Sequence, residues 1–410
     1  MSLFAFILGR EYKLSLAELI HIFGQQNLRD FNEEIAIFEL EKLDSKAILM
    51  LGGTTRIIQI VRETTLESFA TDAIEILSQK EKNSKFSFAL ASFGAKFPLA
   101  DIGMRVKKTL AKNFSVRLLN VKNENIHSAV FKREKLAKTG TEISLIHIAE
   151  KNYLGFSLAC QDIDAYSRRD TAKNRDMVIG MMPPKLVQMM INFLSKNAQK
   201  NGVYDPFCGL GTTLIEAVNR GITTVFGSDI SPEMVANSEE SLTNFIAEEK
   251  KWQERIRTAG GTPQKDFSNL VAKVFPLDAT IIEKAFIDEK NPKNINIISE
   301  GYLGRIMRKE EMTQDIVFSE RRAISRLYEK FFQSLARAKF SGEIVMSFPF
   351  WKVQNVYVFL ENISEIVEQN GFKIESLLPR ELELNTKNGS LLYRRESQNV
   401  GREIIKIVKK

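Results

Sequence analysis

Short apolar runs alternate with amphipathic segments along the first 160 residues of this 410-residue chain. The apolar runs predict strands at 4–8, 34–38, 56–61, 86–91, 116–119, 143–149 and 153–159. Helical spacing of apolar positions predicts helices at 19–23, 45–51, 66–77, 101–112 and 127–138. This alternation is typical of α+β sandwiches, so we expect a ferredoxin-like domain over 1–65 and a second α+β domain over 66–160.

The segment before the first predicted helix carries a helix-start signal. Ser15-Leu16-Ala17-Glu18 matches the capping box, in which a serine and a glutamate three residues later satisfy backbone N–H groups at a helix N-terminus. The helix is therefore expected to start there. His21 lies among apolar residues of this helix, which favours a core histidine over a catalytic one.

The pattern changes after residue 160. Residues 161–180 are polar and dense in charge, a composition that predicts a linker. Beyond them, apolar runs predict strands at 203–204, 223–230, 274–280, 295–300, 343–348, 372–378, 391–395 and 403–407. Helical segments follow several of these runs, at 214–218, after 231, at 319–338 and at 356–369. We therefore expect an α/β domain over 181–410, in which strands alternate with helices.

The first strand of that domain leads into the stretch D-P-F-C-G-L-G-T-T, residues 205–213. A strand, a glycine turn and a helix N-terminus in this order form a corner that can cradle a nucleotide, because glycines let backbone N–H groups approach a ligand closely. No third glycine follows at the spacing of the dinucleotide fingerprint, and the Gly-Lys-Ser/Thr of a phosphate-binding P-loop is missing. The sequence predicts a nucleotide-type site of another kind.

Acidic residues follow the next two strands. Asp229 ends the second strand about twenty residues beyond Gly211, where an acid can accept hydrogen bonds from a ribose diol. Asp278 lies at the end of the third strand.

The charge is unevenly distributed. The chain has a formal net charge of +7, and residues 81–140 hold thirteen Lys or Arg against four Asp or Glu, so the rest of the chain is slightly acidic. A basic module beside a near-neutral one suggests that the first contacts phosphates and the second performs the chemistry. A solvated lysine-rich surface is the simpler alternative.

Several classes of protein are disfavoured by composition. Cys160 and Cys208 are the two cysteines of the chain and lie far apart, which argues against a disulfide scaffold and fits a reducing compartment. Three scattered histidines offer no zinc-ligand cluster, so no metal is expected. No membrane-length apolar run and no signal peptide pattern are present, and we expect a cytoplasmic protein.

The stretch at 205–213 resembles motif I of Rossmann-like S-adenosylmethionine (SAM) methyltransferases that act on exocyclic amines of nucleobases. The resemblance implies a class I methyltransferase fold and SAM as cofactor. It also implies that Asp278 binds the adenine amino group. The cofactor-binding residues would be Asp205, Pro206, Cys208, Gly209, Gly211, Thr212, Asp229 and Asp278.

The second predicted domain resembles a THUMP domain, an RNA-binding module of RNA-modifying enzymes. The likeness lies in its order of elements, its lysine-rich helices and the stretch Ser128-Ala129-Val130-Phe131-Lys132. The linker and the helix start after it (residues 180–190) resemble the arginine-rich link before motif I in THUMP-containing tRNA guanine-N2 methyltransferases. The predicted RNA-binding residues are Arg105, Lys107, Lys108, Lys112, Lys132, Arg133, Lys135, Arg168 and Arg169.

The predicted catalytic residues are Glu300 and Tyr302, at the end of the fourth strand. Amino-group methyltransferases usually carry (D/N)-P-P-(Y/F) there, because an acidic or amide side chain and a carbonyl must accept hydrogens from a weakly nucleophilic amine. The aromatic residue stacks on the base. This chain reads Glu-Gly-Tyr, without either proline, and Gly301 is expected to leave the loop freer than proline would.

The resemblance covers nearly the whole chain and implies a tRNA guanine-N2 methyltransferase that transfers a methyl group by in-line displacement, with guanine ten as the family's usual target. The nucleotide would be flipped out of the folded RNA. A DNA amino-methyltransferase and a non-catalytic RNA-binding protein with a SAM pocket stay open as alternatives, and an NAD-dependent oxidoreductase is a distant third. The sequence leaves open the number of methyl groups added, the choice of tRNA, the oligomeric state and the need for a small helper subunit.

Overall fold

The computed structural model describes residues 1–81, 84–120, 122–139, 141–171, 182–258, 260, 265–286, 295–307, 311–396 and 398–410. The chain divides into two compact units, Met1–Tyr166 and Ser167–Lys410. The upper boundary predicted for the linker, residue 180, lies outside the described residues.

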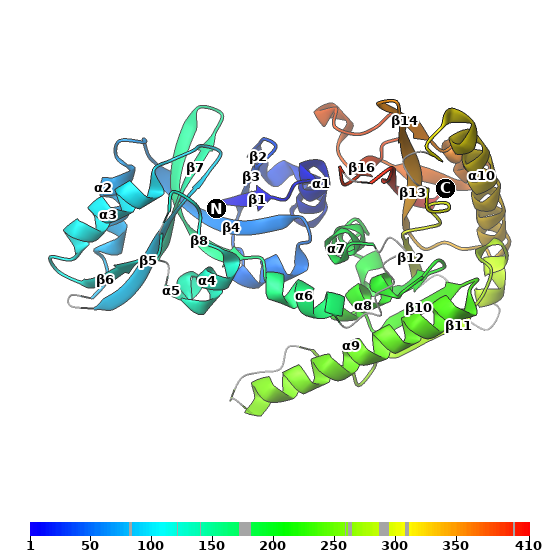
Figure 1. Cartoon of the computed structure of the whole chain (residues 1–410), viewed down its shortest axis with the longest axis horizontal. Helices are drawn as coiled ribbons and strands as arrows, with labels where there is room; N and C mark the ends of the chain where they lie inside the picture. Colours follow the sequence, from blue (N-terminus) through cyan, green and yellow to red (C-terminus); the bar gives the residue numbers. More distant parts are fainter. Residues whose placement is uncertain are drawn as a thin grey trace. The chain divides into compact units, whose positions relative to one another are not determined.

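The first unit is built on one eight-stranded sheet in the order β2-β3-β1-β4-β8-β7-β5-β6 (Figure 1). Its first part contains β1 (Ser2–Leu8), α1 (Tyr12–Phe23), β2 (Leu28–Phe31), β3 (Ile35–Leu40), the 3₁₀ helix η2 (Ser45–Met50) and β4 (Thr54–Glu63). Read from the opposite edge, the first four strands have the order 4-1-3-2, with α1 after the first strand and η2 before the last. This is a ferredoxin-like arrangement in which the second helix is reduced to 3₁₀ turns.

The rest of the first unit continues the same sheet. It contains α2 (Phe69–Leu77), β5 (Lys85–Phe93), α3 (Leu99–Leu110), β6 (Ser115–Leu118), α4 (Ser128–Arg133), α5 (Leu136–Thr139), β7 (Glu142–Ile148) and β8 (Lys151–Cys160). β4 pairs with β1 on one side and antiparallel with β8 on the other. The two domains predicted on either side of residue 65 therefore share one sheet and one compact unit.

Two local predictions in this unit are wrong. α1 already begins at Tyr12, and Ser15 lies inside it, with its hydroxyl donating to the Glu11 carbonyl over 3.2 Å. Glu18 does not cap the helix, because its buried carboxylate accepts from the backbone N–H groups of Gly52 and Gly53 at 2.8 and 2.9 Å. The basic helix predicted over 127–138 is broken into α4 and α5 at Lys135, whose φ of 54° is left-handed.

The second unit has a sheet in the order β11-β10-β9-β12-β13-β17-β15. Its strands are β9 (Gly202–Asp205), β10 (Thr224–Asp229), β11 (Val271–Pro276), β12 (Ile295–Ser299), β13 (Ile344–Val353), β14 (Val356–Phe359), β15 (Phe372–Glu375), β16 (Leu391–Tyr393) and β17 (Val400–Lys409). The strands from β11 to β13 pair in parallel, whereas β17 lies antiparallel between β13 and β15. This confirms the predicted class I Rossmann-like methyltransferase fold, including its inserted antiparallel strand.

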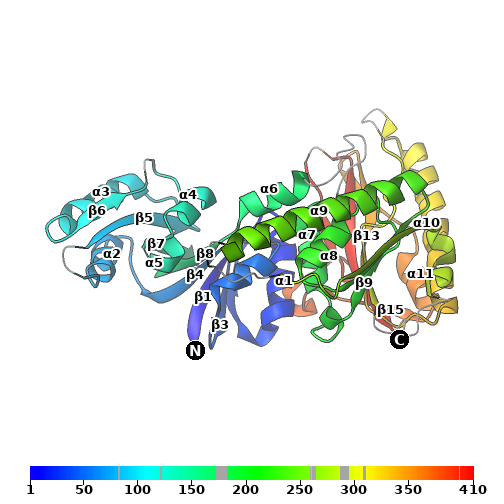
Figure 2. The ribbon, with the colours of Figure 1, turned by 90° about the horizontal axis from the view of Figure 1, so that it is seen from below.

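Helices cover both faces of this sheet, which explains why its central strands are apolar on both sides. α7 (Pro184–Asn192), α8 (Thr212–Asn219) and α9 (Pro232–Thr258) lie on one face, and α10 (Gln314–Arg337) and α11 (Ile363–Gln369) lie on the other (Figure 2). The helix predicted over 356–369 is wrong in its first part. Gln354 and Asn355 adopt left-handed φ values of 48° and 67°, and the chain turns back so that β14 pairs with β13.

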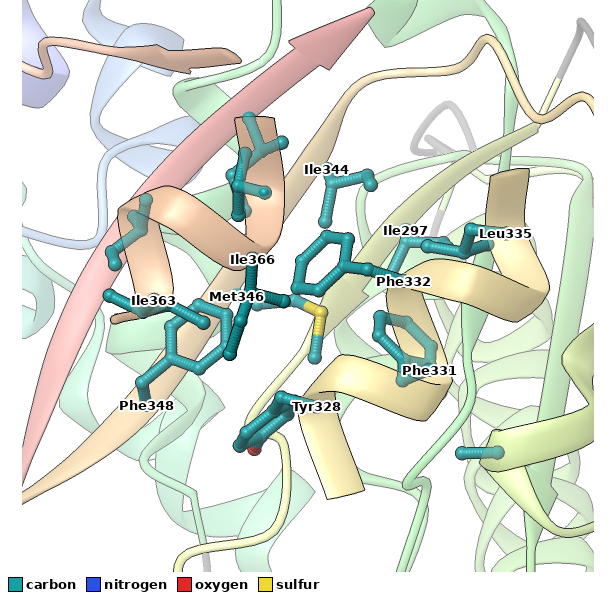
Figure 3. Packing of buried hydrophobic residues seen from close by; sticks show 14 of the residues in the cluster. Ile297, Tyr328, Phe331, Phe332, Leu335, Ile344, Met346, Phe348, Ile363 and Ile366 are labelled. Atoms are coloured by element: carbon teal, nitrogen blue, oxygen red, sulfur yellow. The ribbon is translucent and has the colours of Figure 1, made fainter. Parts of the chain in front are cut away.

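The main core of the second unit lies between α10 and the sheet. Phe331, Phe332 and Tyr328 of α10 pack against Met346 and Phe348 of β13, and all five side chains are fully buried (Figure 3). Burial of each such side chain stabilises the fold by about 2–3 kcal/mol. This core fixes the positions of β12 and β13, and the candidate site includes residues directly after β12. Among the described residues, no helix combines the length and apolarity that a membrane crossing needs.

Candidate active site

A cleft of about 870 Å³ opens beyond the carboxyl ends of the parallel strands of the second unit. Crevices at this edge are the usual ligand sites of open α/β sheets. Six of the residues singled out from the sequence line the cleft, namely Pro206, Gly209, Asp229, Asp278, Glu300 and Tyr302. They come from four separate loops, so the fold brings together residues that are up to 96 positions apart.

The glycine corner shapes one wall of the cleft. Gly209 and Gly211 have left-handed φ values of 49° and 80°. A Cβ at Gly209 would meet no atom within 4 Å, whereas a Cβ at Gly211 would lie 2.6 Å from Ser238 Oγ on α9. Gly209 therefore keeps the corner open toward a ligand, and Gly211 permits α8 to start close against α9.

Asp205 lies behind this wall and is not among the described residues that line the cleft. Its carboxylate accepts from Ser299 Oγ at 2.6 Å and from the Phe207 backbone N–H at 3.0 Å. Burial raises the pKa of Asp205 to about 6, although these hydrogen bonds and one from Thr213 favour the charged form. Asp205 thus connects the loop after β9 to the end of β12.

Three other predicted cofactor-binding residues also lie outside the lining, namely Cys208, Gly211 and Thr212. The thiol of Cys208 is buried, which raises its pKa, and its backbone N–H donates to the Ser228 carbonyl at 2.9 Å. Thr212 is the first residue of α8 and is also buried. These residues shape the corner from behind.

Two carboxylates line the cleft near the glycine corner. Asp229 accepts from the backbone N–H groups of Gly209 and Ser231, at 3.1 and 3.0 Å, through its two different oxygens. Asp278 accepts from the Thr280 N–H at 2.8 Å through one oxygen. Each carboxylate is held in place by the backbone and keeps lone pairs for a ligand with hydroxyl or amino donors.

Glu300, directly after β12, also lines the cleft and forms an ion pair there with Arg402 of β17. Arg402 Nε lies 2.5 Å from Glu300 Oε1. The side chains of Arg402 and Glu300 are 3% and 18% exposed, so the pair is largely removed from water. Burial raises the pKa of Glu300, while the charge and the hydrogen bond of Arg402 act in the opposite direction.

The loop after Glu300 is held by several hydrogen bonds, which corrects the expectation that Gly301 leaves it free. The Gly301 N–H donates to Ser299 Oγ at 3.1 Å, Ser347 Oγ donates to the Glu300 carbonyl, and Tyr328 Oη donates to the Tyr302 carbonyl at 3.1 Å. Gly301 has a φ of 69°, which proline cannot adopt. The exposed Tyr302 side chain therefore projects from an ordered loop.

A Cβ at Gly301 would lie 2.4 Å from Tyr328 Oη and 2.7 Å from the Ser347 carbonyl oxygen. Glycine is thus required by the path of this loop and is more than a relaxed substitute for proline.

The predicted RNA-binding residues differ in their surroundings. Arg169 is buried and pairs with the buried Glu216 of α8 at 2.7 Å, so it is corrected from an RNA contact to a structural residue. Arg168 is exposed and lies over the Trp252 ring, 5.1 Å from its centroid. Lys107 is half-buried. The other predicted residues are exposed on the first unit, namely Arg105, Lys108, Lys112, Lys132, Arg133 and Lys135. Two further linker cations, Lys173 and Arg175, lie outside the described residues.

The sequence interpretation missed part of the cleft. The apolar lining that it missed includes Ile230, Met234, Leu303, Ile306 and Met307, and the polar lining includes Gln398 and Asn399. Arg402 also lines the cleft, and it lies in the stretch 400–403, for which the sequence resemblance predicts structural and substrate contacts and no chemical role. Ile230 directly follows Asp229 at the end of β10, and this position in the sequence was a signal for a role in the site. Ile230 is 71% exposed, which is unusual for isoleucine. Arg402 lies on β17, far from Glu300 in the sequence. No local sequence pattern therefore links the two residues.

No protein-family model matches the chain. A tRNA (guanine(10)-N2)-dimethyltransferase of Methanothermobacter thermautotrophicus is 34% identical over 110 residues, which cover 27% of this chain and 32% of that protein. The match thus spans about a third of the length of that relative.

Several solved structures align with nearly the whole chain. TrmN from Thermus thermophilus aligns with 100% of this chain and 99% of its own, at 14% identity and a TM-score of 0.49. A predicted N6-adenine-specific DNA methylase from Listeria monocytogenes aligns with 98% of this chain and 95% of its own, at 11% identity and a TM-score of 0.43. The order and direction of the strands define the fold of the second unit independently of these likenesses.

Proposed function

We propose that this chain is a SAM-dependent methyltransferase that methylates the exocyclic N2 amine of guanine in tRNA. The observation that carries the proposal is that one cleft is lined both by Gly209, Asp229 and Asp278 and by Glu300 and Tyr302. The first set suits a nucleoside, and the second suits an aromatic amine. The name of the archaeal relative, which matches over 110 residues, adds tRNA, the guanine N2 atom and position ten to the proposal.

The first set of residues fits the nucleoside part of SAM. Asp229 would accept the ribose hydroxyls, since both of its oxygens are already aligned by backbone N–H groups. Asp278 would accept from the adenine amino group through the oxygen that Thr280 leaves open. The open space in front of Gly209 admits the ligand. When bound, SAM would supply an electrophilic methyl group: as the bond from the guanine nitrogen to the methyl carbon forms, the carbon–sulfur bond breaks, S-adenosylhomocysteine leaves, and the nitrogen loses one proton to solvent.

The second set of residues fits the acceptor amine. Its nitrogen lone pair is delocalised into the base, so acceptors for its hydrogens increase its electron density as the new bond forms. Glu300 offers Oε2, because Arg402 binds Oε1. The carbonyls of Glu300 and Tyr302 accept from Ser347 and Tyr328, whereas no hydrogen bond to the Gly301 carbonyl is found within the described chain. We assign the Gly301 carbonyl as the second acceptor and the Tyr302 ring as the surface on which the base stacks.

The first unit would bind the RNA. Its exposed cations on and around α3, α4 and α5 include Arg105, Lys108, Lys112, Lys132, Arg133 and Lys135. Contacts of such side chains with phosphates provide affinity and place the substrate, while the base itself is chosen at the cleft. The target base has to leave its stack before it can enter the cleft, at a cost of a few kcal/mol.

The test is methyl transfer from labelled SAM to unmodified tRNA, followed by mass spectrometry of the nucleosides. We expect N2-methylated guanosine with tRNA and none with single-stranded or duplex DNA. Label on adenine or cytosine of DNA would replace the proposal by a DNA amino-methyltransferase. Tight tRNA binding without incorporation into any tRNA pool would replace it by a non-catalytic RNA-binding protein.

A further inference from the structure

Arg402 lines the cleft but does not belong to one of the parallel strands of the sheet. It lies on β17, the inserted antiparallel strand, and its guanidinium has three neighbours. Nε donates to Glu300 Oε1 at 2.5 Å, one terminal nitrogen donates to Gln398 Oε1 at 3.3 Å, and the Tyr393 ring centroid lies 5.8 Å away. With its side chain 3% exposed, Arg402 is held in one orientation.

The ion pair makes the two oxygens of Glu300 unequal. Oε1 accepts from Arg402, and among the described residues no donor to Oε2 is found. Glu300 nevertheless lines the cleft and its side chain is 18% exposed. A carboxylate that is anchored by one oxygen and open through the other can present a defined acceptor to a bound donor.

We propose that Arg402 is a positioning residue for methyl transfer, which orients the Glu300 carboxylate and balances its charge so that Oε2 accepts from the substrate amine. The inference rests on the proposed function and extends it to β17, which becomes part of the catalytic machinery through Glu300. Arg402 itself need not contact the base.

The electrostatic surroundings of Glu300 support this role. Burial raises its pKa, and Arg402 is the cation that opposes this rise in the described part of the chain. Within the described chain, Asp205 at the end of β9 and the Tyr328 hydroxyl on α10 also interact electrostatically with Glu300. Asp205 repels a charge on Glu300, and the burial that raises the pKa of Tyr328 keeps its hydroxyl neutral. Loss of Arg402 would therefore favour the protonated form of Glu300, which is a poorer hydrogen-bond acceptor for the substrate amine than the carboxylate.

The experiment measures the single-turnover rate of methyl transfer between pH 5 and 9 in the full-length protein. For Arg402→Met we expect the acid limb of the profile to move up by roughly 1–3 pH units, so that the loss of rate relative to wild type is largest at the acid end of the range and becomes smaller toward pH 9. Arg402→Lys keeps the positive charge but lacks the planar guanidinium group. We expect it to keep the acid limb near its wild-type position and to lower the pH-independent rate above that limb, the plateau.

Lys406→Met is the matched control. Lys406 lies four residues further along β17, is also buried, and forms ion pairs with Glu343 and Glu375 at 3.6 and 2.7 Å. It is not among the described residues that line the cleft. Loss of this cation should lower stability without moving the pH profile.

A double-mutant cycle with Glu300→Gln separates positioning from a general structural effect. If Arg402 acts through Glu300, then Arg402→Met should reduce the rate of the Glu300→Gln variant by less than threefold, although it reduces the wild-type rate by tenfold or more. Additive losses, or equal pH profiles for Arg402→Met and Lys406→Met, would overturn the inference and leave the proposed function intact. If Arg402→Met does not fold, an unchanged plateau in Arg402→Lys overturns it. An inactive wild-type protein would overturn both proposals.

Discussion

The hydroxyl of Ser299 donates to the carboxylate of Asp205 at 2.6 Å, and the same oxygen accepts from the Gly301 N–H at 3.1 Å. One side chain thus connects the glycine corner after β9 with the loop that carries Glu300. Since Asp205 is buried and outside the lining of the cleft, its contribution to function is indirect: it fixes the distance between the two halves of the candidate site.

This relationship predicts a pH-dependent stability. The pKa of Asp205 is raised to about 6 in the folded protein, so between about pH 4 and 6 the folded state binds more protons than the unfolded state. The free energy of unfolding should therefore fall across this window as pH rises. Asp205→Asn keeps an acceptor for Ser299 and removes the titration. Its stability relative to wild type should increase from pH 4 to 7 by on the order of 2 kcal/mol.

Urea denaturation of both proteins at pH 4, 5, 6 and 7 measures this difference. A constant offset between the two curves would mean that Asp205 does not titrate in this range.

Gly301→Ala should lower the free energy of unfolding more than the same substitution does at an ordinary glycine with positive φ. The left-handed conformation alone costs an alanine about 1–2 kcal/mol. At Gly301 the new Cβ would also crowd Tyr328 Oη and the Ser347 carbonyl oxygen. Gly221 provides the control, because its φ is 90° and a Cβ there would meet nothing within 4 Å.

Chemical denaturation of Gly301→Ala and Gly221→Ala isolates the effect of crowding, which we expect to be at least as large as the conformational effect. Gly301→Pro, which makes the loop resemble the proline-containing family motif, should abolish methyl transfer because proline cannot adopt this φ. An active Gly301→Pro variant would contradict the assigned loop conformation.

The fold was largely predictable because its signals are local. Strands such as 295–299 and 344–348 are short and mostly apolar, and the glycine corner has a fixed spacing from Asp229. The errors also have local causes. Ser15 and Glu18 match a capping box by sequence, but tertiary contacts of Glu18 with Gly52 and Gly53 decide its role. Helix propensity could not indicate that the helix predicted over 127–138 is interrupted at Lys135.

The candidate site was predictable only in part, because two of its features depend on long-range pairing. The contact of Arg402 with Glu300 follows from the insertion of β17 beside β13. Arg169 is buried where it forms an ion pair with Glu216, which lies 47 positions away on α8. In both cases the residue type was visible in the sequence and its partner was not.

Glu300 and Asp229 should separate catalysis from cofactor binding. Glu300→Gln keeps the size of the side chain and removes the charge that accepts from the amine, so we expect the single-turnover rate to fall by about 10²–10⁴-fold. The SAM dissociation constant should change by less than threefold. Asp229→Ala should weaken SAM binding by roughly tenfold or more, since the variant lacks both aligned acceptor oxygens.

Isothermal titration calorimetry with SAM and rapid-quench methyl transfer give the two quantities. Equal losses of SAM affinity in both variants would contradict the division of the cleft into two functional sides.

Lys108 and Lys112 should contribute to RNA affinity by binding phosphates. Both are exposed at the end of α3, and the double change Lys108→Ala and Lys112→Ala should reduce the salt dependence of tRNA binding. The slope of log affinity against log salt should decrease by about 0.9 for each lysine that neutralises a phosphate in the wild-type complex. Lys373→Ala on the second unit is a control with an equally exposed lysine. Unchanged slopes in the double variant would remove these residues from the RNA-binding surface.

Neighbouring arginines in α6 (Ile163–Thr171) should differ sharply in their effects on stability. Arg169 pairs with Glu216, which is fully buried and also accepts from Gln188 at 3.1 Å, so Arg169→Met removes a cation from a buried carboxylate. We expect a loss of about 3–5 kcal/mol in the free energy of unfolding. Arg168 is exposed and lies over Trp252, and Arg168→Ala should cost about 1 kcal/mol or less.

The combination of Arg169→Met with Glu216→Gln provides a further check. Removing the carboxylate charge together with Arg169 should recover a large part of the stability, because the penalty of the single change comes from a buried charge that has lost its arginine. If Arg169→Met and Arg168→Ala were equally mild and tRNA affinity fell only in the Arg169 variant, Arg169 would contact RNA and the structural role assigned to it would fail.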